Sequence, residues 1–304
     1  MMALGDGHAS RQSMSWPNLD DLLGGDASAP IGLVGAPLGA GSVTPGRCDL
    51  APALLRKTLR RIGLYDIEAK RELSSRIRDL GDAAIDGMTI EQATDPIRDL
   101  VASSVAAHPL TLLIGGNNAV TRPGVQGLTI PLAEVGLITI DAHLDMRDLT
   151  RGLGNGNPVR ALMEDGLPGA NIAQVGLAPF ANSKEMHDDA LAAGNKVVTI
   201  GEVEKDGIEA AIQSALAHVA HCEALFVDCD IDVIDRSQFP GAPGARPGGM
   251  RAKDFFAATR MLAAERRVRA IDLTEWDPPL DPTDLSALTA ARWIAECVGG
   301  FEAR

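Results

Sequence analysis

The chain has 304 residues and a formal net charge of −13, and aromatic residues make up 3% of it. A charge of this sign repels nucleic acid and anionic membrane surfaces, and so few aromatic side chains leave little for stacking on bases. No apolar run reaches the ~20 residues that a membrane span needs, and the N-terminal segment MMALGDGHASRQSMSW lacks a basic-then-apolar signal pattern. We therefore expect a cytoplasmic protein with no nucleic-acid or membrane partner.

The predicted elements begin after a polar segment, residues 1–29, which we expect to be a flexible N-terminal arm. Short apolar runs then predict strands at 31–35, 110–114, 135–141, 172–176, 196–200, 225–230 and 268–274. Amphipathic stretches between them predict helices near 50–61, 91–107, 158–165, 184–193, 206–221, 252–265 and 283–298. Nearly continuous apolar strands separated by helices are typical of a parallel sheet covered on both faces. The sequence therefore predicts one α/β domain over residues 30–304, a mostly parallel sheet in three α/β/α layers.

Polar side chains follow the predicted strand 135–141 directly, in the segment DAHLD. Because side chains alternate along a strand, Asp141, His143 and Asp145 are expected to project to one side at its end. Three such groups repel one another or remain unsatisfied unless a cation lies among them. The alternative is a turn of solvated acids with a structural histidine.

A second group of acids ends the strand 225–230, where Asp228, Asp230 and Asp232 share one face. Buried carboxylates are costly without a partner, and a bound dication removes that cost. The alternative is a capping and turn region. Ligands bind at the carboxyl ends of parallel strands, so the two acidic segments together predict a metal site. Oxygen ligands with one imidazole favour manganese or magnesium, and such an ion would activate water for hydrolysis.

Three further residues near these segments are candidates for the same site. Glu275 follows the last strand, in TEWDPPLD, where an acid could orient a ligand or merely lie at the surface. Arg147 and Arg160 are placed either to bind an anionic substrate or to pair with nearby acids.

Over roughly residues 30–300 these motifs resemble the ureohydrolase superfamily, which includes arginase, agmatinase, guanidinobutyrase and formimidoylglutamase. GGNNAV is similar to the family's GGDHS, DAHLD to its DAHxD and TEWDPPLD to its EVNPxxD. The stretch from Asp230 to Gly249 is similar to DxDxxDPxxAPGTGxPxPGG without a gap. The resemblance implies an arginase-like fold and a binuclear manganese centre that acts on a guanidinium or amidine carbon.

Within the superfamily, DAHLDMRD followed by NGNPVRALMEDG is most similar to formimidoylglutamase. The implied reaction is hydrolysis of N-formimidoyl-glutamate to glutamate and formamide, in a homo-oligomer. Agmatine and guanidino acids are the alternative substrates. A catalytically impaired relative that serves as a binding or scaffold subunit is the alternative outside enzymes.

The resemblance also implies residue roles. Asp141 and Asp230 would bridge both metals, His143 and Asp232 would complete the second site, and Asp145 would bind the first metal and accept a hydrogen bond from the attacking hydroxide. Glu275 would hold the amidinium nitrogen, and the substrate residues would be Arg147, Asn155 and Arg160. Asn118 stands where the family usually has a metal-binding histidine, so its amide oxygen is the expected ligand there. We therefore expect one tightly held Mn²⁺ and a second, weaker one.

Overall fold

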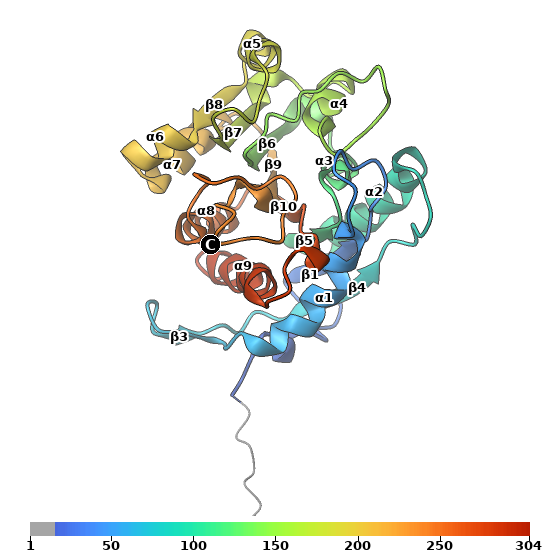
Figure 1. Ribbon diagram of the computed structural model, residues 1–304. Helices are drawn as coiled ribbons and strands as arrows, with labels where there is room; N and C mark the ends of the chain where they lie inside the picture. Colours follow the sequence, from blue (N-terminus) through green and yellow to red (C-terminus); the bar gives the residue numbers. More distant parts are fainter. Residues whose placement is uncertain (1–15) are drawn as a thin grey trace, which may run out of the picture.

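The computed structural model describes residues 16–304, and its frame is one eight-stranded sheet whose strands are all parallel (Figure 1). In spatial order the strands are β4 (Ile77–Asp82), β1 (Ile31–Ala36), β5 (Leu110–Gly115), β10 (Val268–Thr274), β9 (Ala224–Asp230), β6 (Val135–Ile140), β7 (Ile172–Leu177) and β8 (Lys196–Thr199). The predicted α/β fold with a parallel sheet is confirmed.

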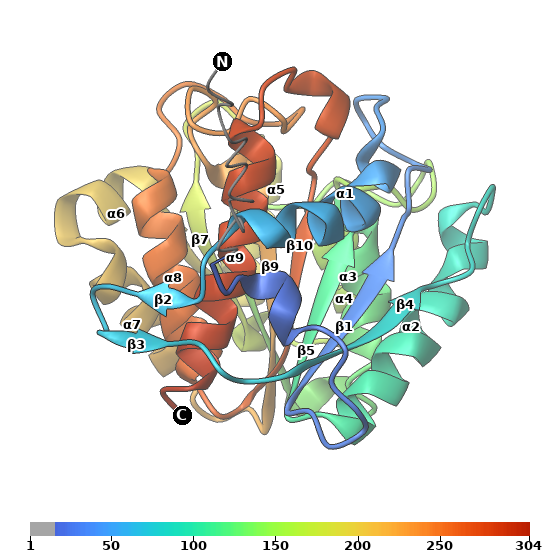
Figure 2. The same cartoon turned by 90° about the horizontal axis from the view of Figure 1, so that it is seen from below.

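Helices cover both faces of this sheet and complete the three layers (Figures 1 and 2). One hydrophobic cluster joins the sheet to α1 (Ala51–Thr58), α6 (Ile200–Asp206), α7 (Ile208–His218), α8 (Ala252–Ala264) and α9 (Leu285–Phe301). The other joins the opposite face to α2 (Ile90–Ala107), α3 (Thr121–Gln126), α4 (Pro158–Glu164) and α5 (Lys184–Ala193). None of the helices in residues 16–304 combines the length and the apolar character needed to cross a membrane.

The two cores explain why the central strands read as unbroken apolar runs. In β9, Leu225 and Val227 pack into one cluster, whereas Phe226 between them packs into the other. Alternating side chains point to opposite faces, and here both faces are buried. The strand therefore needs apolar residues at successive positions, which is the pattern that predicted it.

Several elements escaped prediction, and the strand β4 and the helix α6 (Ile200–Asp206) show why. The edge strand β4 is mostly exposed, so its sequence IRDLGD has no apolar run. The predicted strand 196–200 ends one residue early, because Thr199 and Glu202 form a capping box that starts α6 at Ile200. Gly207, with φ +88°, then separates α6 from α7.

A few residues in the described part of the predicted arm, residues 1–29, pack against the rest of the molecule. Leu19 lies in a short 3-10 helix (Leu19–Leu22), is fully buried, and donates its backbone N–H to the carbonyl of Ile62 at 2.9 Å. Leu22 is buried as well, whereas most of residues 16–29 are exposed, and the flexibility of the arm stays a prediction. The rest of the predicted arm lies outside the described residues.

Candidate metal centre and active-site cavity

The predicted site residues lie at the carboxyl edge of four neighbouring strands, β5, β10, β9 and β6. Asn118 follows β5, Glu275 follows β10, Asp230 ends β9, and Asp141 follows β6. Because parallel strands all end at the same edge of the sheet, four segments far apart in sequence meet there. The position is the one expected for a ligand site in an open α/β sheet.

Five of these side chains form two adjoining groups of metal-competent atoms. Asp141, His143 and Asp232 make one group, and Asp141, Asp145 and Asp230 make the other, with one ligand atom of each residue within 4.8 Å of the others in its group. The imidazole Nδ1 of His143 lies 3.1 Å from Asp232 Oδ2 and 3.5 Å from Asp141 Oδ1. The structure thus brings together the five acidic and histidine ligands that were predicted, and the sixth, Asn118, lies against Asp145.

The backbone after each strand turns in the same way. Asp141 Oδ1 accepts the backbone N–H of His143 at 2.7 Å, and Asp230 Oδ1 accepts that of Asp232 at 2.9 Å. In both cases an aspartate side chain caps the residue two positions on, as such short side chains do in turns. The shared turn directs the alternate side chains of DAHLD and DCDID toward one another.

Two site residues adopt a backbone conformation that non-glycine residues seldom occupy. Asp145 has φ +51° and Glu275 has φ +62°. Such a residue costs of order 1–3 kcal/mol and persists only where the surroundings hold it. The Glu275 backbone is held by a 3.0 Å hydrogen bond from its N–H to the carbonyl of Gly116. Strain concentrated at two acids of one cluster is typical of a functional site.

Crowding and burial perturb the charges of the cluster. Burial raises the pKa of Asp141 to about 6, and burial together with neighbouring carboxylates raises the pKa of Asp145 and Asp230 well above the usual range. Burial acts to lower the pKa of His143, but the charges of Asp232 and Asp141 outweigh it and raise that pKa to about 12. Without a cation, the cluster therefore retains protons among its acids.

The donor set fits a hard dication better than it fits protons. Asp232 Oδ1 is buried and has no hydrogen-bond partner in the described structure. The loop over it approaches so closely that a Cβ on Gly244 would lie 1.8 Å from Asp232 Oδ2. Carboxylate oxygens with one imidazole are ligands suited to manganese. An unpaired buried oxygen in such a cradle is what a coordinated cation would satisfy.

Asn118 lies against the acidic group at Asp145. Its amide nitrogen donates to Asp145 Oδ2 at 2.5 Å, while its Oδ1 accepts from the hydroxyls of Thr121 and Thr274, each at 2.9 Å. The amide of Asn118 thus lies against Asp145 within the acidic group, and metal ligation by its oxygen stays a prediction.

Glu275 and Asn155 are joined beside the cluster. Glu275 Oε1 accepts the backbone N–H of Asn118 at 2.7 Å and the side-chain amide of Asn155 at 2.9 Å. Asn155 Oδ1 in turn accepts the backbone N–H of Val43 at 2.8 Å. Burial raises the pKa of Glu275 to about 7. The predicted pair therefore forms a held acid that faces the cavity.

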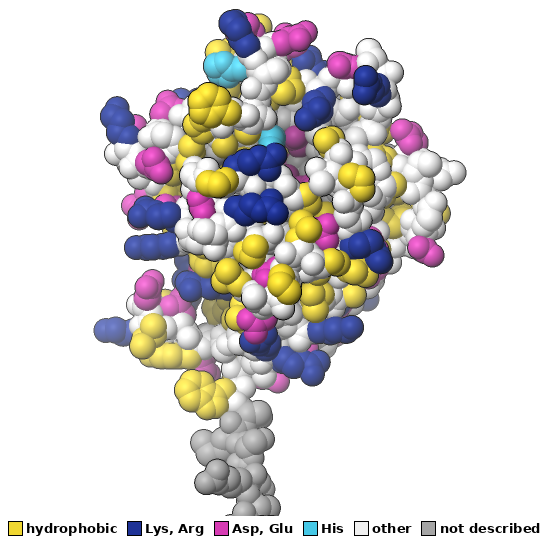
Figure 3. All heavy atoms as spheres, viewed as in Figure 1, with side chains coloured by type: hydrophobic (Ala, Val, Ile, Leu, Met, Phe, Trp, Pro, Cys, Tyr) yellow, Lys and Arg dark blue, Asp and Glu magenta, His cyan; other side chains and the backbone are white. Residues whose placement is uncertain are grey.

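An open cavity of about 640 Å³, counting the space at its mouth, exposes these groups. Its lining contains Val43, Thr44, His143, Asp145, Arg147, Asn155, Gly156, Ala181, Asn182, Met186, Asp230, Asp232, Pro243, Gly244, Arg246 and Glu275. In the space-filling view, basic side chains border the hollow in which a histidine and acidic side chains are visible (Figure 3). The size is that of sites for small molecules.

The two arginines predicted for the substrate have different surroundings. Arg147 lines the cavity. Arg160 does not, because its guanidinium is paired with Asp189 of α5 and its backbone N–H donates to the carbonyl of Asp145 at 3.2 Å. Arg160 thus holds the segment after β6 in place, and its contact with substrate stays a prediction.

Sequence reasoning missed three polar residues of the lining, Thr44, Asn182 and Arg246. Asn182 accepts the N–H of Leu144 at 2.7 Å and donates to the carbonyl of Ala142 at 3.0 Å, so it clamps the DAHLD turn. Arg246 belongs to the stretch that resembles the family, and its charge near Gly244 was the available signal.

Comparison with known proteins agrees with this geometry. The family model described as "Arginase family" matches residues 29–299. A formimidoylglutamase of Halalkalibacterium halodurans is 29% identical over 276 residues, covering 89% of this chain and 86% of that protein. A guanidinopropionase of Pseudomonas aeruginosa is 29% identical over 285 residues, covering 89% and 86%.

Solved structures give the same result. The crystal structure of formimidoylglutamase from Bacillus subtilis superposes with a TM-score of 0.89 at 26% identity, covering 98% of this chain and 96% of that one. Formiminoglutamase of Trypanosoma cruzi, solved with two Mn²⁺ ions, gives 0.86 at 25% identity, covering 95% and 99%. With its parallel sheet, its acidic cluster and a family match over most of its length, the chain belongs to the arginase family of ureohydrolases.

Proposed function

We propose that this ureohydrolase hydrolyses N-formimidoyl-glutamate to glutamate and formamide. The observation that carries the proposal is a shared cavity, in which the acidic groups around Asp145 and Asp230 lie together with the guanidinium of Arg147. The acids suit a metal that activates water, and the arginine suits a substrate with a carboxylate. Relatives named formimidoylglutamase, at 29% and 27% identity, support this substrate.

The chain's own residues would hold Mn²⁺ in two adjoining positions. Asp141, His143 and Asp232 would provide one and Asp141, Asp145 and Asp230 the other, so Asp141 would serve both. When bound, the metal supplies Lewis-acid activation of water near neutral pH.

The remaining steps fall to side chains around the cavity. Asp145, oriented by the amide of Asn118, would accept a hydrogen bond from the attacking water. Glu275, held by Asn155, would accept one from the amidinium nitrogen and so orient the carbon for attack. The C–N bond to the glutamate nitrogen breaks. The carbon leaves with the new oxygen and its other nitrogen as formamide, and the glutamate nitrogen takes the proton.

A substrate panel tests the proposal. The Mn²⁺-loaded protein is assayed for glutamate and formamide from N-formimidoyl-glutamate, and for urea from 3-guanidinopropionate, 4-guanidinobutyrate, agmatine and arginine. We expect the formimidoyl compound to have the highest kcat/KM, and Asp230→Asn to abolish turnover. Asp235→Asn is the control, because Asp235 is an acid of the same loop outside both metal-competent groups. Urea release as the dominant activity would contradict the proposal.

A guanidino-acid hydrolase is the second candidate, favoured by the guanidinopropionase relative at 29% identity. It would share the acidic groups and Arg147 but release urea from a substrate with one carboxylate. An impaired, non-catalytic relative would bind Mn²⁺ and turn over none of the panel. The panel and a metal titration together separate the three functions.

A further inference from the structure

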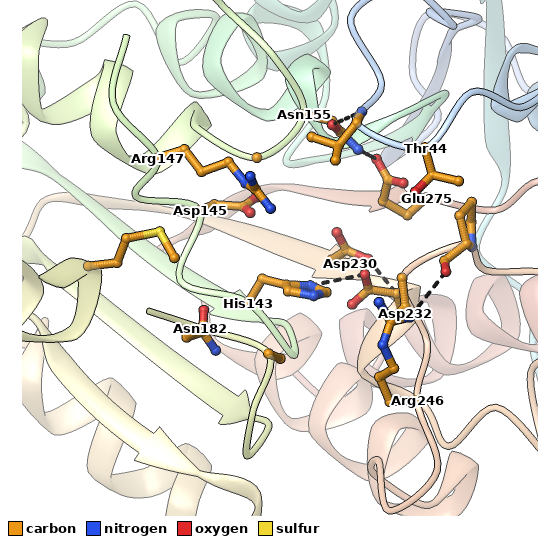
Figure 4. Close-up of a pocket in the computed structure, with 16 residues that line it drawn as sticks. Thr44, His143, Asp145, Arg147, Asn155, Asn182, Asp230, Asp232, Arg246 and Glu275 are labelled. Carbon is orange, nitrogen blue, oxygen red and sulfur yellow. Dashed lines mark hydrogen bonds and ion pairs between the residues drawn. The ribbon is translucent and has the colours of Figure 1, made fainter. Parts of the chain in front are cut away.

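Two basic side chains reach the cavity from different segments. Arg147 follows the DAHLD turn after β6, and Arg246 lies in the long loop after β9. Among the described residues that line this cavity, Arg147 and Arg246 are the only ones that are lysine or arginine. Figure 4 shows them on opposite sides of the acids, with His143, Asp230 and Asp232 between them.

Neither guanidinium is neutralised by a carboxylate. Within residues 16–304, no ion pair includes Arg147 or Arg246, whereas Arg160 is paired with Asp189. Five carboxylates lie at the cavity or just beneath it, those of Asp141, Asp145, Asp230, Asp232 and Glu275. Two unpaired cations beside so many acids indicate that other anions are expected there.

Backbone contacts fix the approach of each arginine and leave its head free. A Cβ on Gly156 would lie 2.8 Å from Arg147 Cδ, so the stem of Arg147 runs directly over the backbone of Gly156. Arg246 donates through Nη1 to the carbonyls of Gly244 at 2.8 Å and Ala245 at 3.2 Å. These hydrogen bonds use one of its nitrogens, and a guanidinium has three.

We propose that Arg147 and Arg246 each bind one carboxylate of a dianionic substrate, so that the cavity prefers a linear amidine with two carboxylates. This inference rests on the proposed function and specifies how its substrate is recognised. A guanidinium presents a planar fork that matches one carboxylate. A glutamyl group has two carboxylates, so a single arginine could not bind both of them in this way. Arg246 takes the place that the sequence alone assigned to Arg160.

A chemical double-mutant cycle tests the pairing. kcat/KM is measured for the Mn²⁺-loaded protein and for Arg147→Gln, Arg246→Gln and Arg251→Gln, on N-formimidoyl-glutamate and on its two monoamides. Each cavity variant should lose about tenfold to a hundredfold on the diacid, mainly through KM. That loss should vanish on one monoamide, and on a different monoamide for each arginine. Arg251→Gln should match the parent, because Arg251 pairs with Asp254 at 2.7 Å outside the cavity.

Two outcomes would overturn the inference. One is an Arg246→Gln protein within threefold of the parent on every substrate. The other is a loss that is equal on the diacid and both monoamides, which would mark a structural effect. Arg246→Lys should recover part of the loss, because lysine keeps the charge without the fork. Unchanged circular dichroism and Mn²⁺ stoichiometry would show that each variant is folded.

Binding of glutamate, measured by calorimetry on the Mn²⁺-loaded protein, separates this inference from the proposed function. If the parent fails to hydrolyse N-formimidoyl-glutamate, the proposed function fails. Weaker glutamate binding in both Arg147→Gln and Arg246→Gln, with no change in Arg251→Gln, would still support the paired arginines. Equal glutamate affinity in all four proteins would refute them.

Discussion

The amide of Asn118 makes the two halves of the acidic cluster chemically unequal. The group around His143 contains an imidazole, whereas the group around Asp145 and Asp230 contains carboxylates and faces the N–H of Asn118. A neutral amide oxygen is a weaker ligand for manganese than an imidazole nitrogen. We therefore predict one tightly bound Mn²⁺ and a second that is lost on dialysis, and that Asn118→His strengthens the second. Titration calorimetry on both proteins measures the two affinities.

Asp235→His is a suitable control for that titration, because it adds an imidazole outside the two groups. Two equally tight sites in the unmodified chain would contradict the inequality. An unchanged weak site in Asn118→His would show that the limiting ligand lies elsewhere.

Glu275 gives the metal-free protein a pH dependence of defined sign. Burial raises its pKa from 4.5 to about 7, so the folded state retains a proton that the unfolded chain releases. The stability gained from protonated Glu275 is present below pH 4.5 and is lost as the pH rises through 7. A pKa shift of this size corresponds to about 3 kcal/mol in the free energy of unfolding. We expect Glu275→Gln to lack this loss.

Urea unfolding with a chelator at pH 5 and pH 8 measures the effect. Relative to the parent, Glu275→Gln should gain stability between these two pH values, while Glu68→Gln on the exposed β2–β3 hairpin (Tyr65–Asp66 and Arg71–Glu72) should not. A constant difference between parent and variant would refute the role of burial.

The sequence predicted those site residues whose direction follows from their strand. Asp141 and Asp230 end apolar strands, and the alternation along each strand places His143 and Asp232 with them. The partners of Arg160 and Arg246 were not predictable in this way. Long side chains on loops point where tertiary neighbours allow, and neither Asp189 nor the carbonyl of Gly244 stands in a fixed sequence relation to a strand.

Among the elements, the loop after β9 depends most on one small residue. A Cβ on Gly244 would lie 1.8 Å from Asp232 Oδ2 and 3.1 Å from His143 Cε1. We predict that Gly244→Ala displaces the loop or the carboxylate and weakens Mn²⁺ binding at the His143 group by at least tenfold. Gly201→Ala is the matched control, because its new Cβ would meet nothing closer than 4.0 Å. Metal titration of both variants decides, and equal affinities would contradict the prediction.

Strands that are buried on both faces were predictable, because burial requires apolar residues at successive positions. β9 and β10 are covered on both faces and read as apolar runs, whereas β4 is exposed and does not. The start of α6 was marked by the Thr199–Glu202 capping box, a signal that the apolar residues Val197 and Val198 just before it obscured. The capping box therefore determines where β8 ends and α6 begins, although the apolar residues predicted that the strand would continue.

For the whole molecule, assembly into a homo-oligomer remains a prediction from the family resemblance. Sedimentation equilibrium of the purified protein should give a mass that is a multiple of 31.8 kDa. A mass of one chain at micromolar concentration would contradict it. The surface offers exposed apolar side chains, Tyr65 and Ile67 of the β2–β3 hairpin among them, that such an assembly would cover.

The place of β10 in the sheet has a consequence for biosynthesis. β10 is the last strand to be made, yet it lies between β5 and β9 and so joins the two halves of the sheet. A nascent chain that ends before residue 268 can form β4–β1–β5 and β9–β6–β7–β8 only as separate units. Pairing at long sequence separation is slow, so the final insertion is expected to limit maturation. A chain truncated after residue 267 should bind Mn²⁺ at least a hundredfold more weakly, although it retains Asp141, His143, Asp145, Asp230 and Asp232. The cell would therefore metallate this protein only after β10 has been synthesised and inserted.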